Sequence, residues 1–183
     1  GSITGGVIEG NISDGGGGGV LLRISDVDFA DVVIRGNSTS YWGGGALFEQ
    51  GSHATLYRVI ITGNHGCALD VASESHVVLE DSEISFTVGY SGALIRTEAE
   101  AAFNNCTIIN NQTIGIYIDN ASEVDLTNTI VWDNQAQIRF NGNGELLNLS
   151  YSDIEGGLER VQNLEGNEVN WGDGMIDSDP LFV

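Results

Sequence analysis

Residues 103–111 read F-N-N-C-T-I-I-N-N, and this stretch decides the fold because its pattern recurs along almost the whole chain. The pattern is an apolar residue, a second apolar residue five positions later, and an Asn three positions after that. A repeat of 23 to 27 residues predicts a solenoid in which each repeat forms one coil. The second apolar position recurs at Ile8, Ile34, Ile61, Ile84, Ile108, Val131 and Ile154.

Each coil is expected to be built from short β-strands that stack into parallel sheets. A repeat of this length cannot hold two helices and a loop, and its apolar residues alternate in short runs. Residues 103–108 are expected to supply one or two strand segments of a coil, and residues 45–48, 68–71, 92–95, 115–118 and 137–140 are expected to supply the next strand of successive coils. Alternation turns Leu69, Val71, Ala93, Ile95, Ile116, Ile118, Ile138 and Phe140 inward, and Asp70, Leu94, Tyr117 and Arg139 outward.

The Asn of the pattern is expected to have a structural role. Asn37, Asn64, Asn111 and Asn134 would lie one above another in the same turn of successive coils. Stacked side-chain amides hydrogen-bond along such a column, and Asn tolerates the backbone conformations of turns. The sequence therefore predicts an Asn ladder.

Composition limits the partners of this acidic chain. The 183 residues carry a formal net charge of −20, with six Arg and no Lys. Nucleic acid is excluded because phosphate binding requires clustered cations. No apolar run is long enough to span a membrane, so membrane insertion is not expected. Cys67 and Cys106 fall in different parts of their coils, so a disulfide is not expected.

Two closing segments give the chain a family resemblance. Residues 151–157 read Y-S-D-I-E-G-G, and residues 177–183 read D-S-D-P-L-F-V. With the N-x-I-x-x-N-type coils, they resemble bacterial secreted and surface proteins of the right-handed parallel β-helix, or pectin-lyase-like, superfamily. The resemblance implies an all-β, right-handed parallel β-helix of about six or seven coils and an extracellular or cell-surface location. It implies no single activity, because this fold carries lyases, hydrolases, epimerases, adhesins and inert surface domains.

A single domain over residues 1–183 is expected, with coils over about residues 6–157 and an irregular cap over about residues 158–183. The first coil has no comparable cap, which favours a chain that is part of a longer multidomain protein. A solenoid must cover its last coil. The side chains expected to do so are Leu158, Val161, Leu164, Met175, Leu181 and Phe182.

The first two coils carry enlarged turns, at residues 14–19 and 38–45, that project from one edge of the solenoid. Insertions on one face of a repeat protein often mark its binding side. Aromatic rings on this edge offer flat apolar faces to a sugar, which predicts a carbohydrate-binding site. Its predicted ligand-binding residues are Tyr41, Trp42, His65 and Tyr90.

The outward wall of the same strands offers a second, catalytic hypothesis. A polysaccharide lyase or epimerase needs a base, an acid and a cation near one another. The candidates on this wall are Asp70, Tyr117, Arg139, Arg96 and Asp119. The alternative explanation is that Arg and Asp on successive coils form cross-strand pairs.

No cofactor is required by any of these hypotheses, but the acidic end offers ligands for calcium. Asp173, Asp177 and Asp179 lie close together among glycines and present hard oxygen ligands. The alternative is that Asp177 and Asp179 cap turns through the backbone.

The sequence thus favours a secreted or cell-surface β-helix module that contacts a polysaccharide or cell-surface glycan. The alternatives are a polysaccharide lyase or epimerase, and a purely structural segment of a larger adhesin.

Overall fold

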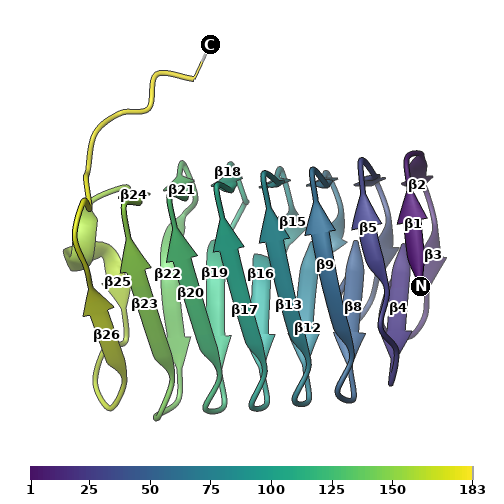
Figure 1. The fold of residues 1–183 in the computed structure, drawn as a ribbon, viewed down its shortest axis with the longest axis horizontal. Coiled ribbons are helices and arrows are strands. Elements are labelled where there is room, and N and C mark those ends of the chain that lie inside the picture. Colours follow the sequence, from purple (N-terminus) through teal and green to yellow (C-terminus); the bar gives the residue numbers. More distant parts are fainter. Residues whose placement is uncertain (183) are drawn as a thin grey trace.

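The computed structural model describes residues 1–182 and consists of about seven stacked coils (Figure 1). All strand pairings between successive coils are parallel, which confirms the predicted all-β parallel β-helix. Three long sheets run along the axis and a fourth, short sheet covers four coils. The N-terminus lies at one end of the stack, and the C-terminal segment leaves the other end (Figure 1).

The first and second sheets take the first two strands of each coil. The first sheet contains β1 (Ser2–Thr4), β5 (Asp28–Ala30), β9 (His53–Tyr57), β13 (His76–Glu80), β17 (Glu100–Asn104), β20 (Glu123–Thr127), β23 (Leu146–Ser150) and β26 (Glu168–Trp171). The second sheet contains β2 (Val7–Glu9), β6 (Val33–Arg35), β10 (Ile60–Thr62), β14 (Glu83–Ser85), β18 (Thr107–Ile109), β21 (Ile130–Trp132) and β24 (Asp153–Ile154).

The short sheet and the third sheet complete each coil. The short sheet contains β3 (Ile12–Ser13), β7 (Ser38–Thr39), β11 (His65–Gly66) and β15 (Val88–Gly89). The third sheet contains β4 (Val20–Arg23), β8 (Ala46–Glu49), β12 (Leu69–Ala72), β16 (Ser91–Arg96), β19 (Ile114–Asp119), β22 (Ala136–Asn141) and β25 (Val161–Gln162). A short 3-10 helix, η1 (Gly157–Arg160), precedes β25.

The repeated apolar position of the sequence forms one continuous row in the second sheet. Ile61 pairs in register with Ile34 on one side and with Ile84 on the other, and Ile108 follows Ile84. These side chains are buried with the inward residues of the other sheets, so stacking creates one core along the axis. The largest fully buried side chains include Phe29, Phe48, Phe103 and Phe140.

A single residue with positive φ forms the corner between the first and second sheets. Asp31, Arg58 and Asn105 occupy this corner with φ between 51° and 57°. Outside glycine, such a backbone conformation is common only for Asn and Asp, so Arg58 is an exception. The corner turns the chain sharply and lets the next residue, such as Val32 or Val59, point into the core.

The predicted Asn ladder is present, with one interruption. Asn37 donates from Nδ2 to Asn64 Oδ1 at 3.1 Å, and Asn111 donates to Asn134 Oδ1 at 3.0 Å. Asn11 extends the column, because its Nδ2 donates to Asn37 Oδ1 at 2.9 Å. Between Asn64 and Asn111 the position is occupied by Thr87, whose buried Oγ1 has no hydrogen-bond partner among residues 1–182. The ladder therefore consists of two separate segments.

The outward face of the third sheet is more covered than the alternation suggested. The inward residues are buried as predicted, and Arg139 is exposed. Asp70, Leu94 and Tyr117 point away from the core but retain only 0%, 2% and 8% of their accessible surface. The outward orientation of these three residues is as predicted, but neighbouring side chains cover them: Tyr90 packs against Leu94 and Tyr117, and Arg96 hydrogen-bonds to Asp70.

The C-terminal segment seals the last coil with a different set of side chains from the expected one. Val161 is buried and Met175 packs against the core, as predicted, and Val169 and Trp171 pack beside them. Strand β25 pairs with β22 and strand β26 pairs with β23, and these pairings bring Val161 and Val169 into place. The other side chains expected to seal the end remain exposed: Leu158, Leu164, Leu181 and Phe182.

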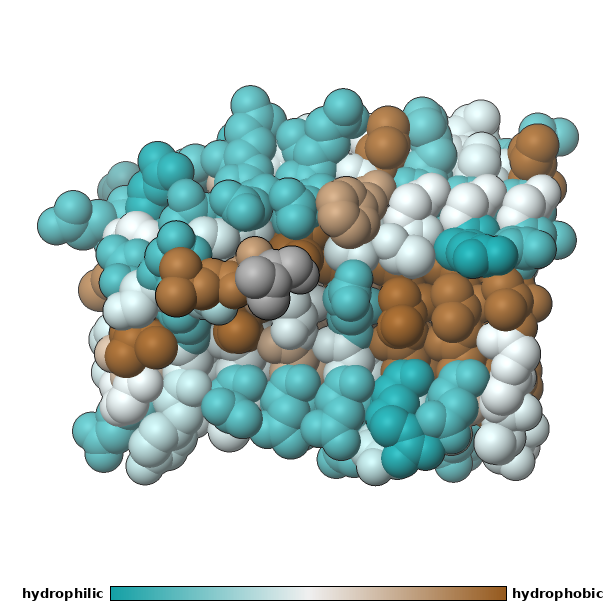
Figure 2. Space-filling view, turned by 90° about the horizontal axis from the view of Figure 1, so that it is seen from above, coloured by the Kyte–Doolittle hydropathy of each residue, from teal (hydrophilic) through white to brown (hydrophobic). Residues whose placement is uncertain are grey.

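The view onto the second sheet shows an apolar patch at the N-terminal end of an otherwise mostly polar face (Figure 2). Val7, Val33 and Ile60 occupy one register row of β2, β6 and β10 at that end. The row ends at β14, where Glu83 takes the same register position.

Candidate functional site

The two enlarged turns lie side by side at the edge beside the short and third sheets. Gly17 N donates to Trp42 O at 3.1 Å, and Gly18 N donates to Gly43 O at 2.9 Å. A Cβ at Gly18 would lie 2.4 Å from Gly44 O, so the glycine tract lets the two backbones approach. The prediction that both turns project from one edge is confirmed.

All four predicted ligand-binding residues line one pocket of about 350 Å³, the aromatic pocket. The rings of Trp42 and Tyr90 meet edge to face, with centroids 5.2 Å apart and an interplanar angle of 72°. Tyr41 and Trp42 remain 64% and 40% exposed. Their role in binding stays a prediction. The pocket is lined by Thr39, Ser40, Tyr41, Trp42, His65, Gly66, Gly89 and Tyr90.

Beneath Trp42 lies an ion pair between a partly exposed Arg96 and a buried Asp70. The guanidinium carbon of Arg96 is 5.5 Å from the centre of the Trp42 ring, within range of a cation–π contact. Arg96 Nε and Nη2 each donate to a carboxylate oxygen of Asp70, both at 3.1 Å. Burial raises the pKa of Asp70 to about 6, although Arg96 acts in the opposite direction.

Tyr90 continues the aromatic surface toward the C-terminal coils. The ring centroids of Tyr90 and Tyr117 are 5.7 Å apart, and the guanidinium carbon of Arg139 is 6.0 Å from the centre of the Tyr117 ring. Burial, with a contribution from Tyr117, raises the pKa of Tyr90 to about 12. The Tyr90 hydroxyl is therefore protonated at neutral pH and can donate a hydrogen bond.

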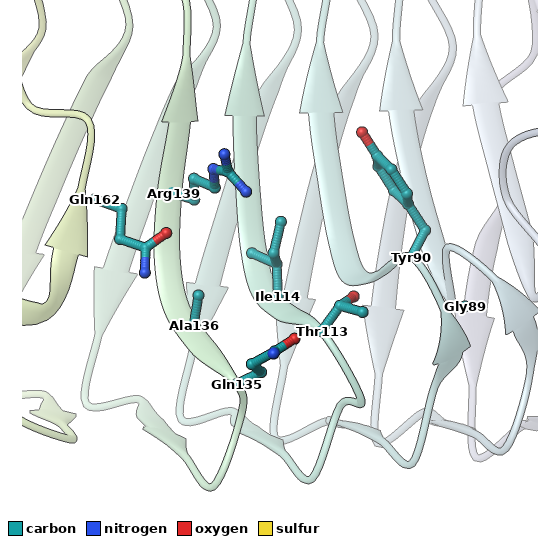
Figure 3. A pocket seen from close by; sticks show the side chains of 8 residues that line it. All are labelled: Gly89, Tyr90, Thr113, Ile114, Gln135, Ala136, Arg139 and Gln162. Carbon is teal, nitrogen blue, oxygen red and sulfur yellow. The ribbon is translucent and has the colours of Figure 1, made fainter.

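A second pocket, of about 550 Å³, adjoins the first and contains polar side chains that the sequence reasoning missed (Figure 3). Thr113 and Gln135 immediately precede β19 and β22, and Gln162 lies on β25. Thr113 and Gln135 share a place just before third-sheet strands on successive coils, whereas Gln162 is in register with Arg139, so no single sequence position marks the three. We call this the polar pocket; it is lined by Gly89, Tyr90, Thr113, Ile114, Gln135, Ala136, Arg139 and Gln162.

The proposed catalytic residues are divided among three separate pairwise contacts. Asp70 and Arg96 form the cross-strand pair that was the alternative explanation. Asp119 Oδ1 accepts a hydrogen bond from Asn141 Nδ2 at 3.1 Å on the next coil. Tyr117 and Arg139 stack on each other. Because Asp70 is fully buried and doubly hydrogen-bonded, it is not placed to meet a substrate. A catalytic role for the set stays a prediction.

Two of the three candidate calcium ligands at the C-terminal end, Asp177 and Asp179, accept hydrogen bonds from backbone amides. Asp177 Oδ1 accepts from Gly156 N at 2.9 Å, and Asp179 Oδ1 accepts from Leu181 N at 2.9 Å. Over residues 1–182, no group of three or more His, Cys, Asp or Glu side chains is arranged to hold a metal ion. Calcium binding by Asp173, Asp177 and Asp179 stays a prediction, and it would require further oxygen ligands besides these carboxylates.

Both cysteines are buried free thiols, in agreement with the expected lack of a disulfide. Burial raises the pKa of Cys67 to about 12 and that of Cys106 to about 11, so neither is a reactive thiolate at neutral pH. In the part of the chain that the structure describes, no helix has the length and apolar character needed to cross a membrane.

One comparison with known proteins gives a family match. A family model described as a right handed beta helix region matches residues 2–91, which include both enlarged turns. Coils beyond residue 91 continue the same ladders without a break. Neither the curated proteins nor the solved structures gave a significant match.

Proposed function

Because this chain is a right-handed parallel β-helix protein, we propose that it is an exported or cell-surface module that binds carbohydrate through the aromatic pocket. The observation that carries the proposal is the gathering of Tyr41, Trp42, His65 and Tyr90 around one opening. Tyr41 and Trp42 are 64% and 40% exposed, although aromatic side chains gain free energy by burial. Exposed rings held in a fixed geometry suit the apolar face of a sugar.

Several contacts hold Trp42 in place, which favours binding without a large entropic cost. Trp42 is held from below by Arg96 and from the side by Tyr90. Its backbone carbonyl accepts a hydrogen bond from Gly17 in the neighbouring turn. A binding surface that is already in place loses little conformational entropy on association.

A binding module is better supported than a lyase or epimerase. The strongest carboxylate candidate, Asp70, is covered by Arg96 and Trp42. Tyr90, the tyrosine that lines both pockets, has a raised pKa, which opposes its use as a base at neutral pH.

Glycan binding by wild-type protein and by Trp42→Ala tests the proposal. Immobilised plant, bacterial and animal polysaccharides serve as the first screen, and titration calorimetry with the best ligand gives the affinity. Truncating a central aromatic anchor costs more than about 1 kcal/mol, so we expect a loss of about fivefold or more in affinity.

The matched control is Tyr151→Ala. Tyr151 is 62% exposed but lies in a corner near the C-terminal end, away from the pocket. We expect its affinity to equal that of the wild type, and circular dichroism confirms that both variants are folded. Lack of binding to every polysaccharide, or equal affinities for wild type and Trp42→Ala, contradicts the proposal and favours a purely structural segment.

Export is tested separately by fractionating cells that express the natural gene. The proposal expects the protein in the medium or on the cell surface. Retention in the cytosol contradicts the location but leaves the binding site to the first experiment.

A further inference from the structure

The aromatic pocket and the polar pocket form one groove along the solenoid axis. They share Gly89 and Tyr90, and together they extend from Trp42, before β8, to Gln162 on β25. Strands of neighbouring coils are about 4.8 Å apart, so a groove that crosses several coils is longer than a single sugar ring. The axial groove, defined by these two pockets, therefore has room for a chain of several sugar units.

The two ends of the axial groove differ in chemistry. The Trp42 end presents aromatic faces, whereas the other end presents Arg139 and the amides of Gln135 and Gln162 (Figure 3). Thr113 also lines this end, and its buried Oγ1 has no hydrogen-bond partner among the described residues. None of the residues that line the polar pocket is acidic. This end is therefore rich in hydrogen-bond donors.

Arg139 and Arg160 are the two arginines of this acidic chain that form no ion pair within residues 1–182, and only Arg139 lines the groove. Four of the six arginines form an ion pair with a carboxylate, whereas Arg139 makes none within residues 1–182. Its guanidinium stacks on Tyr117, which fixes it without neutralising it. The paired arginines are Arg23 with Glu49, Arg35 with Glu9, Arg58 with Asp31, and Arg96 with Asp70.

Net charge limits how many anionic groups the ligand can carry. The formal charge of −20 repels a polymer with a charge on every unit. A single carboxylate can still bind locally, because a guanidinium forms two parallel charge-assisted hydrogen bonds with it.

We propose that the axial groove binds a linear glycan that is neutral at the Trp42 end and carries one carboxylate-bearing sugar at Arg139. This inference rests on the proposed carbohydrate-binding function and adds a second subsite to it. Arg139 binds the carboxylate, Gln135 and Gln162 donate to neighbouring oxygens, and Tyr90 separates the two subsites.

The probes that test the inference are matched pairs of linear hexasaccharides of xylose, glucose or mannose units, each with and without a single glucuronate. Hexagalacturonate is the densely charged comparison. Within the pair whose neutral hexasaccharide binds, we expect the member with one glucuronate to bind about tenfold more tightly than the neutral member. The reason is that a hydrogen bond to a charged group contributes about 1.5 kcal/mol or more. We expect this preference to shrink in 0.5 M NaCl because the charge is partly exposed, and hexagalacturonate to bind weakly.

Arg139→Gln and Arg160→Gln form the matched pair of variants. Arg160 lies on η1, outside both pockets, and has the same formal charge. Arg139→Gln should remove the preference for glucuronate, so that both members of a pair bind with equal affinity, whereas Arg160→Gln should retain the preference. Each variant is checked by its thermal unfolding curve.

The outcomes separate this inference from the proposed function. Binding that is weakened by Trp42→Ala but shows no glucuronate preference, or a preference that survives Arg139→Gln, overturns the second subsite and leaves the aromatic pocket intact. Tight binding of hexagalacturonate overturns the single-carboxylate assignment. Failure of every probe to bind overturns both.

Discussion

Trp42 and Tyr90 meet edge to face at 5.2 Å although they belong to the turns of different coils. Tyr90 in turn lies 5.7 Å from Tyr117, on the outward face of β19. The contact therefore ties the enlarged turn to the third sheet. It also places Tyr90 at the junction of the two pockets.

The first prediction concerns the structural part of this contact. Tyr90→Ala should lower the free energy of unfolding by about 2 kcal/mol, because it removes buried aromatic surface and two ring contacts. Tyr41→Ala should change it by less than about 0.5 kcal/mol, since Tyr41 is 64% exposed. Urea denaturation measures both values. Equal losses in the two variants would show that Tyr90 does not anchor the turn.

The second prediction concerns Asp70 and pH. Its pKa in the folded protein is raised to about 6 from 3.8 by burial, so the folded state binds a proton more tightly than the unfolded state. The resulting stabilisation is complete below about pH 4 and is lost as pH rises through about 6. Its size is on the order of 3 kcal/mol, from 1.36 kcal/mol per pKa unit.

Asp70→Asn removes this titration and so isolates it. The free energy of unfolding of the wild type, minus that of Asp70→Asn, should fall as pH is raised from 4 to 7. Urea denaturation at four pH values measures the difference. A difference that grows with pH would mean that the ion pair with Arg96 outweighs the cost of burying the charge.

The third prediction concerns the Asn ladder. Asn111 is buried and donates to Ile84 O and Asn134 Oδ1. Asn111→Ala should cost about 3 kcal/mol, because it leaves buried partners without hydrogen bonds. Asn170→Ala is the control, since Asn170 is exposed and donates to Asn148 on the first sheet; its cost should be below about 0.5 kcal/mol. Comparable unfolding midpoints for the two variants would contradict a structural ladder.

The replacement of Asn by Thr87 in the ladder is accompanied by the replacement of a glycine by Ala68 in the preceding coil. A Cβ at Gly45, Gly92 or Gly115 would lie 2.8 to 3.0 Å from Nδ2 of the next Asn in the column. Ala68 occupies the register position of Gly45 and Gly92, and it precedes Thr87 instead of an Asn. An Asn thus requires a glycine beside it, whereas the smaller Thr tolerates an alanine.

A double-mutant cycle tests this pairing. Thr87→Asn alone should destabilise the protein, because Ala68 Cβ occupies the space that the amide needs. Ala68→Gly with Thr87→Asn should join the two ladder segments and show a favourable coupling of about 2 kcal/mol. Additive effects in urea denaturation would contradict the dependence of the Asn on the glycine.

The repeat made the fold predictable, because its rows depend on register alone. Ile34, Ile61, Ile84 and Ile108 stack as their spacing implies, and the amides of Asn37 and Asn64 follow. The solvent exposure of the outward side chains was not predictable in the same way. Alternation assigns a side chain to a face, but whether Asp70 is covered depends on where the irregular turn with Trp42 folds back.

The sequence was equally limited in predicting the residues at the ends of the groove and of the solenoid. Tyr41 and Trp42 could be identified because they lie in a turn that is too long for the repeat. Gln135 and Gln162 look like ordinary polar residues in sequence, and only the coiling of the chain brings them beside Arg139. Leu181 and Phe182 were expected to seal the last coil, but the extended segment that carries them leaves the solenoid (Figure 1).

The fluorescence of Trp42 during a glycan titration tests carbohydrate binding at the aromatic pocket most directly. Phe replaces Trp132 and Trp171 in the protein used, so that Trp42 is the single emitter. A polysaccharide fragment that binds this variant in calorimetry is then added stepwise. Glycan binding at the aromatic pocket predicts a saturable shift of the Trp42 emission, with the same dissociation constant as calorimetry gives. Binding in calorimetry with an unchanged Trp42 spectrum would contradict it, because the glycan would then occupy another surface.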